Sequence, residues 1–291
     1  MVDQSGLRDM PIAPKRTIFS KAGSFALHAS IILDFVMGAH GRAYGIGLRD
    51  RAGLVKCFHR NVKAIPSGTT ALSHLAMARE ILSIPPHVHG VVVECGTWKG
   101  ASTASLSLVC HKVGRRLLVC DSFKGLPDEG LQLYVAPHSR IYGYLKGGMF
   151  DGSLAEVQAN INALGQLEVC DFVPGFFAES LKVLTQPIVF AFLDVDLPSS
   201  LRDCLRVIWP LLAHHGTIYV DDIGDMNIVR VFFDDVWWQQ QLGCPAPGLV
   251  GSGCGLPISA IASNLGYIRK LPPFQAHGWR RESDLYYPDG Q

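Results

Sequence analysis

The spacing of hydrophobic positions changes near residue 85 of this chain. Across residues 21–84, apolar side chains recur at helical spacing. The clearest case is 69–82, which follows a Ser67-Gly68-Thr69 start and precedes Pro85-Pro86, a pair that ends a helix. Residues 1–20 lack this pattern and are expected to form a mobile arm. The N-terminal part is therefore predicted to be an arm followed by helices.

Beyond residue 85, short apolar runs alternate with amphipathic segments. Strands are predicted at residues 91–93, 116–120, 167–173, 187–193 and 217–220, and helices at 101–110, 153–164, 179–184, 199–212 and 225–240. Glu156 is placed to complete a capping box with Ser153. Residues 258–262 and 265–270 are expected to add a final antiparallel pair. The alternation predicts an α/β fold with a doubly wound, mostly parallel seven-stranded sheet and helices on both faces.

The composition allows a sizeable core. Of the 291 residues, 48% are hydrophobic and 18% are charged, which is typical of a globular chain and not of a disordered one. We expect an arm and helical extension over residues 1–66 and the α/β domain over residues 67–291. The formal net charge is +1. This argues against a nucleic-acid partner, which requires clustered Lys and Arg.

The cysteines and the N-terminus indicate a cytoplasmic protein. None of the eight cysteines forms a C-x-x-C pair or a zinc spacing, and several lie in apolar runs, so we expect buried, reduced thiols. No charged segment followed by an apolar one marks a secretory signal. The apolar run 25–37 is interrupted by His28 and Asp34 and is too short to span a bilayer. A packed or dimer-forming helix is the better interpretation, with no stable membrane insertion.

The first strand ends in a glycine-containing turn. Ligands bind at the carboxyl ends of the strands in a sheet of this kind. Gly96 would let a ligand approach the backbone closely, and Gly100 would let the next helix pack near the strand. Their spacing is neither the dinucleotide fingerprint nor a P-loop. By itself, this turn is also compatible with a loop that binds no ligand.

An acidic residue, Asp121, ends the second predicted strand, about 25 residues after Gly96. An acid at this position is suited to hold the two ribose hydroxyls of an adenosine group. Because the second glycine of the dinucleotide pattern is missing, no seat for a pyrophosphate is evident. S-adenosylmethionine, a nucleoside without phosphate, therefore fits the pattern better than NAD.

Four acids follow the next two strands. Asp194 and Asp196 end the fourth strand, and Asp221 and Asp222 end the fifth. Strand alternation places Asp194 and Asp196 on one face, and both strand ends meet at the same sheet edge. Four carboxylates in one cleft would repel one another without a cation. Three of them suit Mg²⁺, which prefers oxygen ligands. The alternative is that these acids cap the following helices.

Five segments, taken in order, resemble the macrocin O-methyltransferase family, whose members methylate sugar hydroxyls on macrolides and aminocoumarins. They are residues 93–100 (VECGTWKG), 121–127 (DSFKGLP), 175–181 (GFFAESL), 193–197 (LDVDL) and 220–222 (VDD). Residues 148–150 and 153–157 also match the segment that precedes the third strand in this family. The similarity covers roughly residues 68–270.

The resemblance implies a class I methyltransferase fold, S-adenosylmethionine as the methyl donor and a Mg²⁺ ion. It implies that Asp194, Asp221 and Asp222 hold the metal, and that Asp196 is the general base, with Asp194 as the second catalytic acid. The cofactor side would consist of Glu94, Gly96, Thr97, Trp98, Gly100, Asp121, Ser122, Phe176 and Asp194. Core packing is an equally good interpretation for Trp98. A homodimer is also implied by the family.

The expected acceptor is a small hydroxylated molecule, and a glycosylated natural product of secondary metabolism fits the family best. In our hypothesis Mg²⁺ binds two neighbouring acceptor oxygens, and Asp196 accepts the proton of the methylated hydroxyl. His138, His214 and His215 are alternative bases. Pro198 departs from the family pattern beside the metal loop, and the segment 132–148 shows little similarity. Two rival functions remain, namely methylation of a catechol or hydroxylated peptide, and a non-catalytic scaffold that binds the cofactor.

Overall fold

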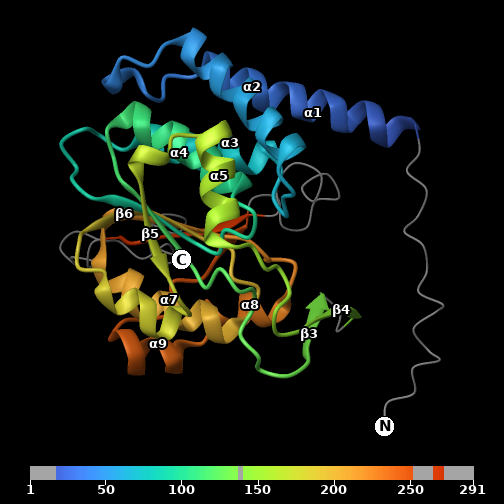
Figure 1. The fold of residues 1–291 in the computed structure, drawn as a ribbon, viewed down its shortest axis with the longest axis vertical. Helices are drawn as coiled ribbons and strands as arrows, with labels where there is room; N and C mark the ends of the chain where they lie inside the picture. Colours follow the sequence, from blue (N-terminus) through green and yellow to red (C-terminus); the bar gives the residue numbers. More distant parts are fainter. Residues whose placement is uncertain (1–17, 137–139, 252–264, 272–291) are drawn as a thin grey trace, which may run out of the picture.

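The computed structural model describes residues 18–136, 140–251 and 265–271 (Figure 1). Seven strands within these ranges form one sheet, in the order β5-β2-β1-β6-β7-β9-β8. Their bounds are β1 Val91–Cys95, β2 Leu117–Asp121, β5 Cys170–Pro174, β6 Ile188–Leu193, β7 Leu212–Val220, β8 Val250–Gly251 and β9 Gly266–Arg269. The strand predicted at 258–262 and most of the predicted N-terminal arm lie outside the described residues.

The sheet is parallel except at one edge. β5, β2, β1, β6 and β7 run parallel, whereas β9 pairs antiparallel with both β7 and β8. The predicted fold class, a mostly parallel seven-stranded sheet, is confirmed. In a parallel sheet the carboxyl ends of β2, β1, β6 and β7 lie at one edge. The turns that follow these strands are therefore brought together.

One face of the sheet is covered by the N-terminal helices and by α4 and α5 (Figure 1). The bounds on this side are α1 Ile18–Met37, η2 Arg42–Tyr44, α2 Leu48–Ala64, α3 Ala71–Ser83, α4 Ala101–Val113 and α5 Leu154–Leu164. Phe58 of α2 and Leu75 of α3 are buried with Val92 and Phe190 of the sheet in one hydrophobic cluster. The helical extension thus shares its core with the sheet.

The opposite face is covered by α7 Pro198–Leu211, α8 Met226–Val231 and α9 Asp235–Leu242, with the short α6 Phe177–Ser180 and η5 Leu181–Val183. Val93 packs on this face while its neighbour Val92 packs on the other, as strand alternation requires. Trp238 is fully buried here, and its indole N–H donates to the Val231 carbonyl at 2.8 Å. Both faces of the sheet are therefore closed by packed helices.

Several predicted boundaries are wrong, each for a local reason. The helix predicted over 225–240 is two helices, because the Asp234 carboxylate accepts the Trp237 N–H and starts α9 anew. The third strand begins later than predicted, since η4 Leu167–Val169 precedes β5. β7 begins earlier than predicted, because the hydrogen bond from the His215 N–H to the Lys270 carbonyl extends its ladder.

The expected capping box on α5 forms only in part. Ser153 accepts the Glu156 N–H at 3.2 Å, as an N-cap should. The Glu156 carboxylate instead accepts from the Lys99 ammonium at 2.8 Å. Glu156 thereby ties α5 to the turn after β1.

A two-stranded hairpin lies outside the main sheet. It consists of β3 Gln132–Ala136 and β4 Arg140–Leu145, and Figure 1 shows it beside α8. We refer to it as the hairpin. Within the ranges that the structure describes, no helix is long and apolar enough to cross a membrane.

Candidate active site

A cleft of about 270 Å³ opens where β1, β2, β6 and β7 end. The turns after these strands line it with the following residues predicted from the sequence: Gly96, Thr97, Trp98, Asp121, Ser122, Phe176, Asp194, Asp196, Asp221 and Asp222. Glu94 and Gly100, also predicted, do not line it. The fold thus brings most of the predicted site into one cavity.

Gly96 permits the close contact between the ends of β1 and β6. Its φ is +84°, and a Cβ at this position would lie 1.7 Å from the Asp194 carbonyl oxygen. No side chain larger than hydrogen fits there. The sequence suggested close approach by a ligand, whereas the nearest group in the structure is the backbone of Asp194. This contact helps to fix where the Asp194 side chain begins.

The Asp121 carboxylate joins the first two turns. One oxygen accepts from the Thr97 N–H at 2.7 Å, and the other accepts from the Phe123 N–H at 2.7 Å. Ser122 holds the same turn by donating from its hydroxyl to the Gly125 carbonyl at 2.7 Å. The first oxygen also accepts from the Thr97 hydroxyl at 3.2 Å, whereas the oxygen bound to Phe123 keeps a lone pair for a ligand hydroxyl.

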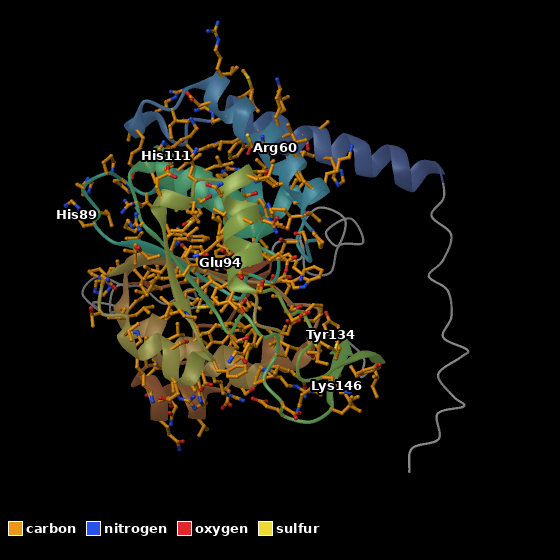
Figure 2. The ribbon with its side chains drawn as sticks, in the orientation of Figure 1. Arg60, His89, Glu94, His111, Tyr134 and Lys146 are labelled. Carbon is orange, nitrogen blue, oxygen red and sulfur yellow. The ribbon has the colours of Figure 1, made fainter. Side chains whose placement is uncertain are left out.

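Glu94 is fully buried between the sheet and α4 (Figure 2). One carboxylate oxygen accepts from the Ser102 hydroxyl at 2.5 Å, and the other has no partner among the described residues. Burial raises the pKa of Glu94 to about 7. Gly100 lies behind the cleft, where it starts α4 in a left-handed conformation. Glu94 reaches the cleft through Ser102, which does line it.

Three carboxylates converge at the ends of β6 and β7. Asp194, Asp221 and Asp222 each offer an oxygen, and these oxygens lie within 4.8 Å of one another. Burial and the neighbouring acids raise the pKa of Asp194 and Asp221 well above the usual range, and they raise the pKa of Asp222 to about 6. A divalent cation relieves this repulsion, and an all-oxygen set suits Mg²⁺. The residues present therefore fit such an ion.

Asp196 lies beside this cluster. Burial and the charge of Asp222 raise the pKa of its carboxyl group to about 8. Its φ is +57°, and that of Asp222 is +56°, so both acids have left-handed backbones. Trp98 and Phe150, which also line the cleft, share this conformation. Uncommon backbone geometry of this kind clusters at functional sites.

The hairpin brings Tyr134 toward the acids, and Figure 2 shows this side chain on the hairpin. Burial, together with the charges of Asp222, Asp225 and other nearby acids, raises the pKa of Tyr134. Asp225 anchors the hairpin by accepting the Val135 N–H at 3.2 Å, while it also caps α8. The sequence analysis missed Tyr134, because nothing in residues 132–148 indicates which side chain lies near the acids.

Residues 66–69, where the predicted extension meets the predicted domain, form a further wall that the sequence analysis missed. Thr69 contacts the buried His74 at 2.8 Å, and His74 contacts Ser105 of α4 at 3.0 Å. Asn61 of α2 donates to the same Ser105 hydroxyl at 3.2 Å. Burial lowers the pKa of His74 to about 3, so the ring is neutral. This network fixes Thr69 against the cofactor cleft.

The three histidines, Trp98 and Pro198 are the other candidates from the sequence. His214 and His215 lie on the exposed start of β7 and do not line the cleft. His138 lies outside the described residues. Trp98 packs edge-on against Phe150, with ring centroids 5.8 Å apart, while it still lines the cleft. Pro198 occupies the first turn of α7, where a missing N–H does no harm.

Comparison with known proteins assigns the family. Residues 66–247 match the model of the macrocin-O-methyltransferase (TylF) family. The chain belongs to this family. It is therefore an S-adenosylmethionine-dependent O-methyltransferase, and the cleft at the strand ends lies within the matched segment. The predicted resemblance is confirmed.

Solved structures of methyltransferases are similar to this macrocin-O-methyltransferase family member. The calicheamicin methyltransferase CalS11 is 17% identical, with a TM-score of 0.51 over 87% of this chain and 93% of that one. The O-methyltransferase NovP is 17% identical, with a TM-score of 0.49 over 86% and 100%. The Podospora anserina methyltransferase PaMTH1 is 12% identical, with a TM-score of 0.47 over 90% and 98%. No curated protein matches the sequence.

Proposed function

We propose that this enzyme methylates a hydroxyl group of a sugar, or of a glycosylated natural product, with the help of Mg²⁺. The metal proposal rests on the convergence of Asp194, Asp221 and Asp222, whose oxygens lie within 4.8 Å of one another. The sugar acceptor is supported by the family, whose members methylate sugar hydroxyls, and by CalS11, a methyltransferase of calicheamicin.

The cofactor occupies the part of the cleft formed by the turns after β1 and β2. Asp121 accepts from the ribose hydroxyls, and its own hydrogen bonds to Thr97 and Phe123 hold the carboxylate in place. Gly96, Thr97, Trp98, Ser122 and Phe176, which line the cleft, would contact the bound cofactor. Glu94 and Gly100 support this seat from behind. S-adenosylmethionine supplies an electrophilic methyl group on its sulfonium.

The four acids have two proposed roles, metal binding and proton transfer. Asp194, Asp221 and Asp222 would hold Mg²⁺, which when bound lowers the pKa of a coordinated hydroxyl group. Asp196 accepts the proton that leaves the acceptor hydroxyl, a role suited to a carboxylate whose pKa is raised toward neutrality. Asp194 borders both the proposed metal site and Asp196, and it holds the two at a fixed relative position. The buried walls of the cleft exclude water and orient the two reactants.

The proposal extends to the organisation of the chain. Residues 67–291 form the methyltransferase domain and residues 1–66 an arm and helical extension. Leu33 and Met37 of α1 are 62% and 59% exposed, which supports a homodimer through this helix. The described cysteines are free thiols, in accord with a cytoplasmic location.

Calorimetry and mass spectrometry test the function. We expect S-adenosylmethionine to bind the wild-type enzyme, and a mass increase of one methyl group on glycosides with vicinal hydroxyls in Mg²⁺ but not in EDTA. Asp221→Asn should abolish this turnover and leave cofactor affinity largely intact. Turnover that survives both EDTA and Asp221→Asn contradicts the metal proposal. Transfer only to catechols or peptides contradicts the sugar acceptor, and tight cofactor binding without any transfer favours a scaffold.

A further inference from the structure

A second hollow, of about 530 Å³, adjoins the cleft at Asp196, which lines both. Its walls come from the hairpin, α7 and α8, each of which contributes two characteristic side chains. The hairpin side contributes Leu131 and Leu133, α7 contributes Pro198 and Arg202, and α8 contributes Asn227 and Arg230. We call this hollow the hairpin pocket. It is distinct from the cofactor side of the cleft, where Gly96 and Asp121 lie.

The walls of the hairpin pocket differ in chemistry. The hairpin wall is apolar, since Leu131 is 64% exposed and Leu133 is 44% exposed. The helix walls carry two guanidinium groups, Arg202 and Arg230. An apolar surface faced by two cations is suited to a ligand with a ring and an anionic group.

No carboxylate within the described residues neutralises the charge of Arg230. The side chain is exposed in the last turn of α8. Arg202, in contrast, forms an ion pair with Asp234 at 3.0 Å and packs over the Trp237 ring. Its buried Nε–H has no partner among the described residues. Arg230 therefore offers an unpaired charge to a ligand, and Arg202 offers only those terminal N–H groups that Asp234 does not use.

Two acids also line the hairpin pocket, and neither forms an ion pair with Arg230 within the described residues. Asp225 is buried, and one of its carboxylate oxygens accepts the N–H groups of Val135 and Asn227. Asp196 lies at the junction with the cleft, where the proposed function has it face the acceptor hydroxyl. The hairpin pocket thus joins an acidic junction to a wall with two arginines.

We propose that the hairpin pocket binds the part of the acceptor beyond the methylated hydroxyl, and that this part carries a phosphate or carboxylate group. The inference rests on the proposed function, because a hydroxyl that reaches Asp196 places the rest of its molecule in the adjoining hollow. Arg230 and Arg202 bind the anionic group, and the exposed leucines of the hairpin cover the sugar ring.

Binding to the loaded enzyme tests this assignment without any turnover. Calorimetry uses the full chain with S-adenosylhomocysteine and Mg²⁺, and three probes: UDP-glucose, methyl glucuronide and methyl glucoside. We expect at least one anionic probe to bind at least tenfold more tightly than the neutral glucoside, with an affinity that falls as salt increases. The preferred anionic probe distinguishes phosphate from carboxylate.

Variants identify the arginine. Arg230→Gln should weaken the anionic probe about tenfold or more, since it removes a charged hydrogen bond. Arg230→Lys, which keeps the charge, should recover part of this loss. Arg206→Gln is the matched control, because Arg206 lies on α7, packs over the same Trp237 ring and does not line the hairpin pocket.

Three outcomes overturn the inference: the neutral glucoside binds as tightly as the anionic probes, neither anionic probe binds, or Arg230→Gln changes nothing. These outcomes leave the proposed function intact if S-adenosylmethionine still binds and methyl transfer still requires Mg²⁺. Failure of cofactor binding, in contrast, removes the proposed function itself.

Discussion

Asp196 combines three properties at the scale of a single residue. It lies at the junction of the cleft and the hairpin pocket, its pKa is raised to about 8, and it is adjacent to the cluster of Asp194, Asp221 and Asp222. A carboxylate whose pKa lies close to the operating pH removes a proton more effectively than an ordinary surface acid. These properties make Asp196 the strongest candidate for the general base.

Asp196→Asn should therefore lower kcat by about 10²–10⁴-fold, the usual contribution of a general base. The affinity for S-adenosylmethionine should stay within about twofold, because the amide keeps the shape of the side chain. Steady-state kinetics and calorimetry measure the two effects. Asp203→Asn, on the exposed side of α7, is the control. Full activity in Asp196→Asn would assign the proton transfer to another group.

At the scale of elements, the hairpin is attached to the catalytic core by a few polar contacts. Asp225 accepts the Val135 N–H, the Asn227 side-chain amide donates to the Leu133 carbonyl at 3.1 Å, and the Ser199 hydroxyl donates to Glu129 at 2.7 Å. These contacts hold the hairpin wall of the hairpin pocket against α7 and α8. The hairpin wall depends most on Asp225, since the same side chain also caps α8.

Asp225→Ala should raise the KM for the acceptor severalfold, with little change in cofactor affinity, because the hairpin loses its anchor. Loss of the cap should also lower the free energy of unfolding by about 1–2 kcal/mol. Ser153→Ala removes the N-cap of α5, far from the hairpin, and is the matched control. Equal acceptor KM values in the two variants would show that the hairpin contributes nothing to acceptor binding.

The parallel strands could be predicted from the sequence, whereas the α8–α9 break and the hairpin could not. Period and turn signals located every strand of the parallel sheet, because β1, β2 and β6 are buried apolar runs and each strand has a distinct end. The break between α8 and α9 was missed, since Asp234 interrupts a pattern that otherwise continues. The hairpin was missed because β3 and β4 are half-exposed and pair only with each other.

Some residues of the candidate site could likewise be predicted from the sequence, and others could not. Asp194, Asp221 and Asp222 could be placed together from the sequence, because parallel topology brings strand ends to one edge. Tyr134, Arg230 and residues 66–69 could not be placed. Tyr134 lies on the hairpin, Arg230 on a short helix and residues 66–69 just before α3, and the positions of these segments depend on tertiary packing.

At the scale of the whole molecule, the crowded acids link stability to pH. Burial and neighbouring charges raise the pKa of Asp222 to about 6 and of Asp196 to about 8. A carboxyl group with a raised pKa favours the folded state while it is protonated. Its contribution is complete below the ordinary pKa and is lost as the pH rises through the folded value. The metal-free fold should thus lose stability between about pH 4 and pH 8.

Thermal unfolding measures this effect. In EDTA, Tm should fall as the pH rises across this window, by about 2–4 °C for each kcal/mol lost. In Mg²⁺ the decline should be smaller, so the difference between the two curves should widen with pH. Asp222→Asn should flatten the EDTA curve. Parallel curves at all pH values would mean that these acids bind no cation.

The left-handed backbones of Asp196 and Asp222 have a consequence for attempts to engineer this enzyme. Glycine at either position would relax a backbone with φ near +57° and remove a buried charge as well. Selection for heat resistance alone, in a metal-free medium, would therefore favour variants without their acids. Robust libraries from such a screen would be enriched in inactive proteins, so selection must retain a requirement for turnover.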